Sequence, residues 1–170
     1  MVPAMFDLLN FFGSVPAFRP EWGLQAPDTQ IALTIHGKIC WPNRASALCL
    51  DAPLLRQFAQ QDIVTTTDWP GLERQQIFRG VALADLLLAA GWRGTEVELT
   101  GADGYTAAVP LAALRDAGGL IATEWNGMPM PCTRFAPLWL VFPYDTAQTP
   151  LERLTQARRS VWKLVEIEIV

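Results

Sequence analysis

A succession of short β-strand patterns, most of them followed by a turn signal, limits the folds that this sequence can adopt. In residues 96–100 and 161–170, successive side chains alternate between a more apolar and a more polar set. Such alternation is typical of strands that bury one face. Asn126-Gly127 is the dipeptide that most strongly favours a tight turn between strands. We therefore predict strands at residues 31–35, 63–67, 96–100, 105–109, 120–124, 138–142 and 161–170.

Helical patterns are fewer and shorter. Asp51 precedes Pro53, which predicts a helix capped by the aspartate. Residues 81–90 place their leucines on one face and end before Gly91, the residue that favours a helix C-terminus. We also predict a short helix at residues 110–116 and a short helix or turn at 150–158.

Strands and helices do not alternate regularly, which favours an α+β fold with a mixed or antiparallel sheet and peripheral helices. The chain has 170 residues, the length of one ordinary domain. Residues 1–29 contain several Pro and Gly and little periodicity, so we predict an irregular N-terminal arm followed by one domain at residues 30–170.

Composition disfavours several classes of function. The net charge is −4, whereas binding to a phosphate backbone requires clustered Lys and Arg, so we expect no nucleic-acid partner. We expect no membrane span, because the sequence has no run of about 18 apolar residues. His36 is the only histidine and there is no C-x-x-C, which disfavours a metal site rich in His or Cys. No P-loop, G-x-G-x-x-G or nucleophile elbow is present.

The three cysteines and the N-terminus leave the compartment open. The simplest interpretation of Cys40, Cys49 and Cys132 is three small buried side chains, but Cys40 and Cys49 could pair in an exported protein. Residues 1–18 are apolar but contain no Lys or Arg, so the basic start of a secretory signal is missing.

Six motifs occur in one order along the chain: residues 65–69 (TTTDW), 78–87 (FRGVALADLL), 99–105 (LTGADGY) with 109–111 (VPL), 126–130 (NGMPM), 137–145 (PLWLVFPYD) and 159–162 (RSVW). Together they resemble the molybdopterin-binding domain of the sulfite-oxidase family, and most of all its short bacterial members. The resemblance covers about residues 30–170. It implies a sulfite-oxidase-like mixed β-sheet fold with short peripheral helices in a single domain.

Catalytic members of this family place a cysteine thiolate on molybdenum, in the stretch before the F-x-G-V-x-L motif. Here that stretch, residues 65–70, contains three threonines and no cysteine, and a hydroxyl is a poor replacement for a soft thiolate. None of the three cysteines matches the position. The short members without this cysteine look like periplasmic regulators that bind a reduced pterin and signal to a membrane partner controlling cyclic-di-GMP.

The resemblance therefore implies a pterin-binding protein rather than an enzyme. The expected cofactor is a reduced pterin, either molybdopterin-like or a tetrahydropterin, without molybdenum. The expected partner is the periplasmic domain of a membrane signalling enzyme, and the expected location is the periplasm, with the cytoplasm left open. Two alternatives remain: a molybdopterin-dependent oxidoreductase or its subunit, and a protein-interaction domain whose pocket is filled by side chains such as Phe135.

A pterin is a flat bicycle whose faces favour aromatic walls and whose edge favours backbone groups or a carboxylate. Thr67 and Asp68 lie nearest the position of the missing thiolate, and Trp69 is expected to form a wall. Asp103 and Tyr105 lie at a turn beside a strand, where Asp103 could equally serve only to form the turn.

Three further residues complete the predicted ligand site. They are Arg134 in the loop after the Asn-Gly turn, Tyr144 in an expected exposed turn, and Arg159 before the last strand. An arginine could stack on the ring or bind a phosphate or hydroxyl, or it could simply cap the preceding helix in solvent. Trp139 and Trp162 are expected in the core.

Overall fold

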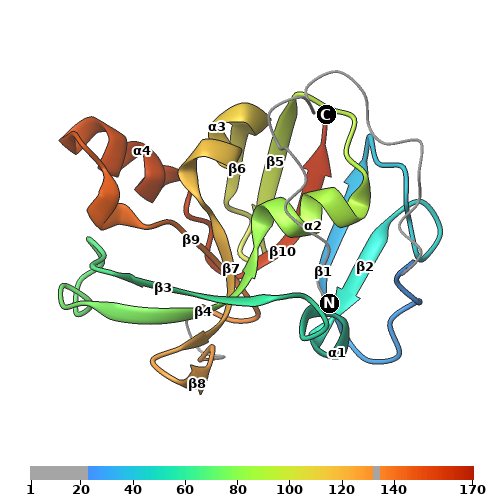
Figure 1. The fold of residues 1–170 in the computed structure, drawn as a ribbon, viewed down its shortest axis with the longest axis horizontal. Coiled ribbons are helices and arrows are strands. Elements are labelled where there is room, and N and C mark those ends of the chain that lie inside the picture. Colours follow the sequence, from blue (N-terminus) through green and yellow to red (C-terminus); the bar gives the residue numbers. More distant parts are fainter. Residues whose placement is uncertain (1–22, 132–134) are drawn as a thin grey trace, which may run out of the picture.

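The computed structural model describes residues 23–131 and 135–170. Within these residues, ten strands form two five-stranded sheets (Figure 1). The first sheet has the order β2-β1-β10-β5-β6, and only its β1–β10 pair is parallel. Its strands are β1 (Ile31–Gly37), β2 (Leu48–Asp51), β5 (Glu96–Gly101), β6 (Thr106–Pro110) and β10 (Leu164–Ile169).

The second sheet is antiparallel throughout and has the order β3-β4-β7-β8, with β9 also pairing with β7. Its strands are β3 (Gln60–Thr65), β4 (Gln76–Ala82), β7 (Leu120–Trp125), β8 (Met128–Pro129) and β9 (Trp139–Val141). Side chains from both sheets contribute to one apolar core cluster. This core is the reason that the two sheets hold their relative positions.

Short helices lie around the sheets. They are α1 (Ala52–Leu55), α2 (Leu83–Ala90), α3 (Leu111–Ala117), the 3₁₀ helix η2 (Tyr144–Thr146) and α4 (Pro150–Arg159). Helix α2 crosses the face of the first sheet, and α4 lies at the opposite end of the molecule from α1 (Figure 1). Helix α4 buries none of its residues, so polar contacts rather than core packing must hold it in place.

The predicted capping residues occupy their expected positions. The Asp51 carboxylate accepts a hydrogen bond of 2.9 Å from the Leu54 amide, which satisfies one of the free N–H groups at the start of α1. Gly91 ends α2 with a φ of 63°, a left-handed conformation that glycine adopts without strain. The prediction of an α+β fold with mixed sheets and short peripheral helices is confirmed.

The bounds of several predicted elements were wrong, including the strand predicted at 161–170, which runs from Leu164 to Ile169. The helix predicted at 81–90 begins at Leu83, because Val81 and Ala82 complete β4 and pair with β7. The strand predicted at 63–67 runs from Gln60 to Thr65, because the polar residues at its start pair with β4. Strands β2 and β4 were not predicted, since their sequences lack a clear alternation of apolar and polar side chains.

Candidate functional site

A pocket of about 340 Å³ lies between the segment after β3 and the end of α4. Segments far apart in the chain build its walls: residues 67–69 on one side and residues 157–162 on the other, with single side chains from the β5–β6 turn and from η2. The lining residues are Thr67, Asp68, Trp69, Tyr105, Tyr144, Ala157, Arg158, Ser160 and Trp162.

Stacked aromatic rings form the apolar part of this pocket. The rings of Trp69 and Trp162 stack with their centroids 4.1 Å apart and an angle of 30° between planes. Phe135 stacks behind Trp162 at 5.3 Å, and the fully buried Trp139 stacks behind Phe135 at 4.5 Å. The pocket wall is therefore the outer surface of a continuous stack that reaches into the core, so the wall is rigid.

The buried Ser160 hydroxyl fixes the inner end of the pocket. It accepts hydrogen bonds from Trp139 Nε1 at 2.8 Å and from the Tyr144 hydroxyl at 2.5 Å, and it donates to the Leu140 carbonyl at 2.6 Å. Burial, the largest influence, raises the pKa of Tyr144 to about 12. Tyr144 is therefore a neutral phenol at physiological pH, with its proton directed at Ser160.

Arg153 connects α4 to the segment after β3. Its Nε and Nη2 atoms donate to both oxygens of Asp68 over 2.9 to 3.2 Å, and Nη1 donates to Asp145 at 3.1 Å. Nη2 also donates to the Thr66 hydroxyl at 3.1 Å. The hydrogen bonds that Arg153 donates to Asp68, the largest influence, raise the pKa of Arg153 above its usual value. This ion cluster supplies the anchoring that α4 does not obtain from the core.

Asp145 completes this cluster from η2. It accepts hydrogen bonds from the amide and the hydroxyl of Thr66, and its own amide donates to the Thr65 hydroxyl at 3.2 Å. Desolvation is the largest single influence and acts to raise the pKa of Asp145. The hydrogen bonds from Thr66 and Arg153 act in the opposite direction and together outweigh it, so the pKa of Asp145 is lowered. The Thr66 amide thus pairs with a side chain, which explains why β3 stops at Thr65.

The structure brings five of the eight predicted site residues together on this pocket. They are Thr67, Asp68, Trp69, Tyr105 and Tyr144.

The other three residues do not line the pocket or cannot be placed. Asp103 accepts a hydrogen bond of 3.2 Å from the Tyr105 amide, the contact of a turn-forming residue. Arg159 is half-buried at the end of α4 and is not among the lining residues, whereas its neighbour Arg158 is. Arg134 lies outside the described residues.

Several features of the site differ from the sequence predictions. Tyr144 is buried rather than exposed, because its ring packs at the end of the core and its hydroxyl reaches Ser160. Trp162 was assigned to the core; it packs against the core as predicted, but it is only half-buried and also lines the pocket. Sequence reasoning missed Ser160 and Arg153; the RSVW motif was a signal for Ser160, and nothing local marked Arg153.

The remaining predicted side chains lie elsewhere. Cys40 and Cys49 are free thiols, with Arg93 Nε donating to Cys40 Sγ at 2.7 Å, and neither lines the pocket. Cys132 is outside the described residues. His36 Nε2 lies 3.3 Å from Glu166 Oε1 on the neighbouring strand β10, as expected for a histidine satisfied at a strand.

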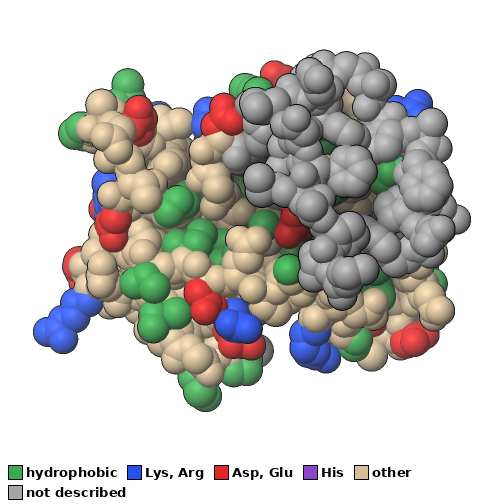
Figure 2. Space-filling view, viewed as in Figure 1, with side chains coloured by type: hydrophobic (Ala, Val, Ile, Leu, Met, Phe, Trp, Pro, Cys, Tyr) green, Lys and Arg blue, Asp and Glu red, His purple; other side chains and the backbone are tan. Residues whose placement is uncertain are grey.

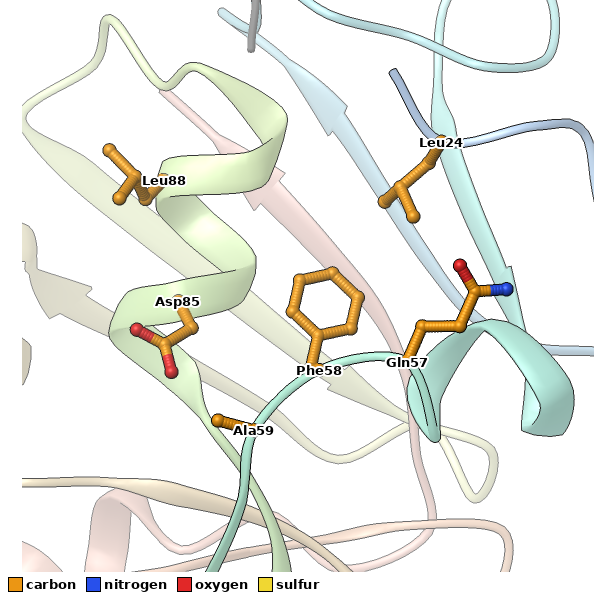
Figure 3. A pocket seen from close by; sticks show the side chains of 6 residues that line it. All are labelled: Leu24, Gln57, Phe58, Ala59, Asp85 and Leu88. Atoms are coloured by element: carbon orange, nitrogen blue, oxygen red, sulfur yellow. The ribbon is translucent and has the colours of Figure 1, made fainter. Parts of the chain in front are cut away.

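A second pocket of about 350 Å³ lies beside α2 (Figure 3). It is lined by Leu24, Gln57, Phe58, Ala59, Asp85 and Leu88. Burial raises the pKa of the Asp85 carboxyl, but none of the predicted ligand-site residues lies here. The pocket at α4 is therefore the better candidate site, since it combines aromatic walls with charged groups.

The pocket at α4 has the size and the flat apolar wall that a planar ring system requires. Its volume is at the lower end of the range for small-molecule sites and its walls include two indole rings. No described lining residue carries sulfur, and the buried Thr67 hydroxyl donates to the Leu72 carbonyl at 3.1 Å. In residues 23–131 and 135–170, no three His, Cys, Asp or Glu side chains gather as a metal site would require.

On the face shown in Figure 2, the Lys and Arg side chains of the described residues are scattered among Asp and Glu rather than gathered into a basic patch. None of the helices in the described part of the chain has the length and apolar character needed to cross a bilayer.

Comparison with known proteins identifies the family. No protein with a curated description matches this sequence. The family model described as the oxidoreductase molybdopterin binding domain matches residues 42–153, which contain β2 to β9 and the first wall of the pocket at residues 67–69. This match covers well over half of the chain and agrees with the motif order and with the two-sheet fold. The chain belongs to the oxidoreductase molybdopterin-binding domain family.

Proposed function

We propose that this domain binds a reduced pterin in the pocket at α4 and acts as a sensor without catalysing a redox reaction. Two features together carry the proposal. The pocket has a wall of indole rings, and it has a hydroxyl group in the stretch where the family resemblance implies a metal-binding thiolate. Trp69 and Trp162 supply the wall, and Thr67 supplies the hydroxyl.

The pocket offers a pterin both of the environments that its ring requires. One face of the bicycle can stack on the exposed indole surface, which contributes dispersion and excludes water. Asp68 and the hydroxyl oxygens of Tyr105 and Tyr144 provide acceptors for the amino groups at the ring edge. The Tyr144 oxygen keeps the same charge at all physiological pH values, since burial raises its pKa to about 12.

Thr67 supports the non-catalytic part of the proposal. Its side chain is 3% exposed, and its hydroxyl donates to Leu72 and accepts a hydrogen bond of 3.4 Å from the Trp69 amide. The hydroxyl therefore shapes the turn that presents Trp69. A hydroxyl is a hard, weakly acidic ligand, in contrast to the soft thiolate that molybdenum receives in catalytic relatives.

The signalling part of the proposal extends the resemblance stated above. We propose that the ligand-loaded domain contacts the periplasmic part of a membrane signalling enzyme, and that this enzyme controls cyclic-di-GMP. Helix α4 supports such a role, because its last turn lines the pocket while Leu151 and Leu154, nearer its start, are exposed.

Extraction of small molecules from the purified protein tests the binding proposal. After denaturation and oxidation, the supernatant should show the fluorescence of an aromatic pterin in a near-stoichiometric amount. Titration of the emptied protein with a tetrahydropterin should then quench tryptophan fluorescence saturably, since Trp69 and Trp162 line the pocket. No extractable pterin and no saturable binding would refute the proposal.

Elemental analysis separates the sensor from the alternative functions. A molybdopterin-dependent oxidoreductase should carry about one molybdenum per chain, whereas the proposed sensor should carry a pterin without the metal. A protein-interaction domain should carry neither. Molybdenum at stoichiometric levels would therefore refute the non-catalytic proposal while leaving pterin binding intact.

A further inference from the structure

The pocket beside α2 is separate from the pocket at α4 and has no part in the proposed pterin binding. Three segments supply its described lining residues: the chain at Leu24, residues 57–59 after α1, and α2 itself. The two pockets share no described lining residue. The volume of about 350 Å³ lies within the range of small-molecule sites. This pocket is therefore a second candidate ligand site.

Apolar side chains form most of its walls. Leu24 and Phe58 are partly buried and pack against the core, which fixes their positions. Leu88 is 49% exposed, although it is a large aliphatic side chain. In Figure 3 the Phe58 ring lies in the middle of the group, with Leu24 on one side and α2, which carries Asp85 and Leu88, on the other. An apolar ligand in contact with these walls would remove hydrocarbon surface from water on both partners.

Asp85 is the one charged side chain among the described lining residues. Its carboxylate is half-buried, and within residues 23–131 and 135–170 it forms no side-chain hydrogen bond and no ion pair. Burial raises the pKa of this carboxyl, because its surroundings solvate the charge poorly. The start of α2 compensates part of the charge, since Asp85 lies in the first turn of the helix. The counter-charge that would compensate the rest is not supplied by the described residues.

The other shielded carboxylates near the two pockets are neutralised by protein groups. Asp51 accepts four hydrogen bonds, three of them from backbone amides. Asp145 accepts from the Thr66 amide and hydroxyl and from Arg153. Asp85 differs from both, because it faces a cavity with its hydrogen-bonding capacity unused. The carboxylate is thus available to a ligand.

We propose that the pocket beside α2 is a second ligand site, that it takes a small organic cation with an apolar body, and that Asp85 binds the cationic nitrogen. An ammonium group donates charged hydrogen bonds to a carboxylate, and such bonds are stronger than neutral ones. The Phe58 ring adds to the selectivity for a cation, because the face of an aromatic ring attracts positive charge. Leu24 and Leu88 accommodate the hydrocarbon part of the ligand.

Three phenyl compounds of similar size and different charge test this assignment. They are 2-phenylethylamine, 2-phenylethanol and 3-phenylpropionate, titrated into the full-length protein near neutral pH and followed by the backbone amide signals in NMR spectra. The amine should shift the amides of Ala59, Asp85 and Leu88 saturably and bind about tenfold more tightly than the alcohol. The carboxylate should cause no saturable shift at these positions. The amides of residues 67–69, at the other pocket, should not respond to the amine.

Variants separate the charge from the shape of the pocket. Asp85→Asn keeps the shape and should lower the affinity for the amine about tenfold, to that of the alcohol, without changing the affinity for the alcohol. Ala59→Leu adds bulk at an exposed lining position and should weaken binding of both compounds. Glu98→Gln removes an exposed carboxylate outside the pocket and should change neither affinity. Circular dichroism first establishes that each variant is folded.

The outcomes are independent of the pterin proposal, which extraction of the purified protein tests separately. Equal affinity for the amine and the alcohol, or a preference for the amine that survives Asp85→Asn, would overturn the inference. No saturable shift with the amine up to about 10 mM would do the same. An amine that shifts residues 67–69 in place of Asp85 would also overturn it, because the amine would then bind in the pocket at α4.

Discussion

Arg153 and Asp68 are 85 residues apart in the sequence, yet the guanidinium group binds both carboxylate oxygens, with Nη2 to Oδ1 at 2.9 Å and Nε to Oδ2 at 3.2 Å. The same guanidinium reaches Asp145 and Thr66. This arrangement joins the two walls of the pocket, since Asp68 belongs to one wall and α4 provides part of the other.

Replacing Arg153 should therefore loosen the pocket as well as destabilise the domain. Arg153→Lys cannot bind Asp68 and Asp145 together, and we expect the free energy of unfolding to fall by about 1 kcal/mol. Urea denaturation measures this change. Arg79→Lys is the matched control, because Arg79 also binds both carboxylate oxygens of an aspartate, Asp62, but both side chains are about half-exposed. Equal losses in the two variants would contradict a special role for Arg153.

The Ser160 hydroxyl should contribute more to stability than its size suggests. Ser160→Ala leaves two buried donors, Trp139 Nε1 and the Tyr144 hydroxyl, without their acceptor, and we expect a loss of about 3 kcal/mol. Tyr144→Phe removes one of these donors and should cost about 1 kcal/mol. The double variant should lose less than the sum of the two single variants, because only one donor is then left unpaired. Thermal and urea unfolding provide the comparison, and strict additivity would contradict the coupling.

Asp145 should make the stability of the domain sensitive to acid. Its folded-state pKa is lowered, so its stabilising effect is complete above the unfolded value of about 3.9 and is lost as the pH falls through the folded value. Asp145→Asn should cost less than about 1 kcal/mol at pH 7, because the carboxylate is partly solvated. The difference from wild type should be constant between about pH 5 and 7 and should shrink below about pH 4. Urea midpoints measured across this range test the trend, and a difference that grew toward low pH would contradict it.

Gly80 should tolerate no side chain. A methyl group at this position would overlap the Ile121 carbonyl oxygen and stand 2.8 Å from the Ala122 Cα atom, at the bulge where β4 pairs with β7. Because both neighbours are backbone atoms in the core, we expect Gly80→Ala to lower the free energy of unfolding by about 3 kcal/mol. Gly71→Ala serves as the contrast: no atom lies within 4 Å of its added methyl, and its φ of 86° should cost only about 1 kcal/mol.

Trp69 should contribute to ligand affinity more than to folding. It is half-buried and forms the outer ring of the aromatic stack. Trp69→Leu should weaken binding of a tetrahydropterin about tenfold, while Trp69→Phe should retain part of the affinity through its ring. Calorimetric titration measures both. Trp92→Leu removes a half-buried indole outside the pocket, so an equal loss of affinity there would show that the effect is not specific to the wall.

Much of the local structure was predictable because it depends on neighbouring residues. The Asp51 cap, the end of α2 at Gly91 and the strands at residues 96–101 and 164–169 all follow from local side-chain patterns. The same patterns misled the prediction at Thr66 and Thr67, whose β-branched side chains favour a strand. There the hydrogen bond of Thr66 to Asp145, 79 residues away, ends β3 instead.

The α+β fold class, the order of the family motifs and the first wall of the pocket at residues 67–69 could all be predicted from the amino-acid sequence. Tertiary structure alone decided that Trp162 stacks on Trp69, that Tyr144 is buried against Ser160, and that Arg153 binds Asp68. The physical reason is distance along the chain. Local propensities act over a few residues, whereas these contacts arise only when two sheets pack around a shared core and bring remote segments to one end of the molecule.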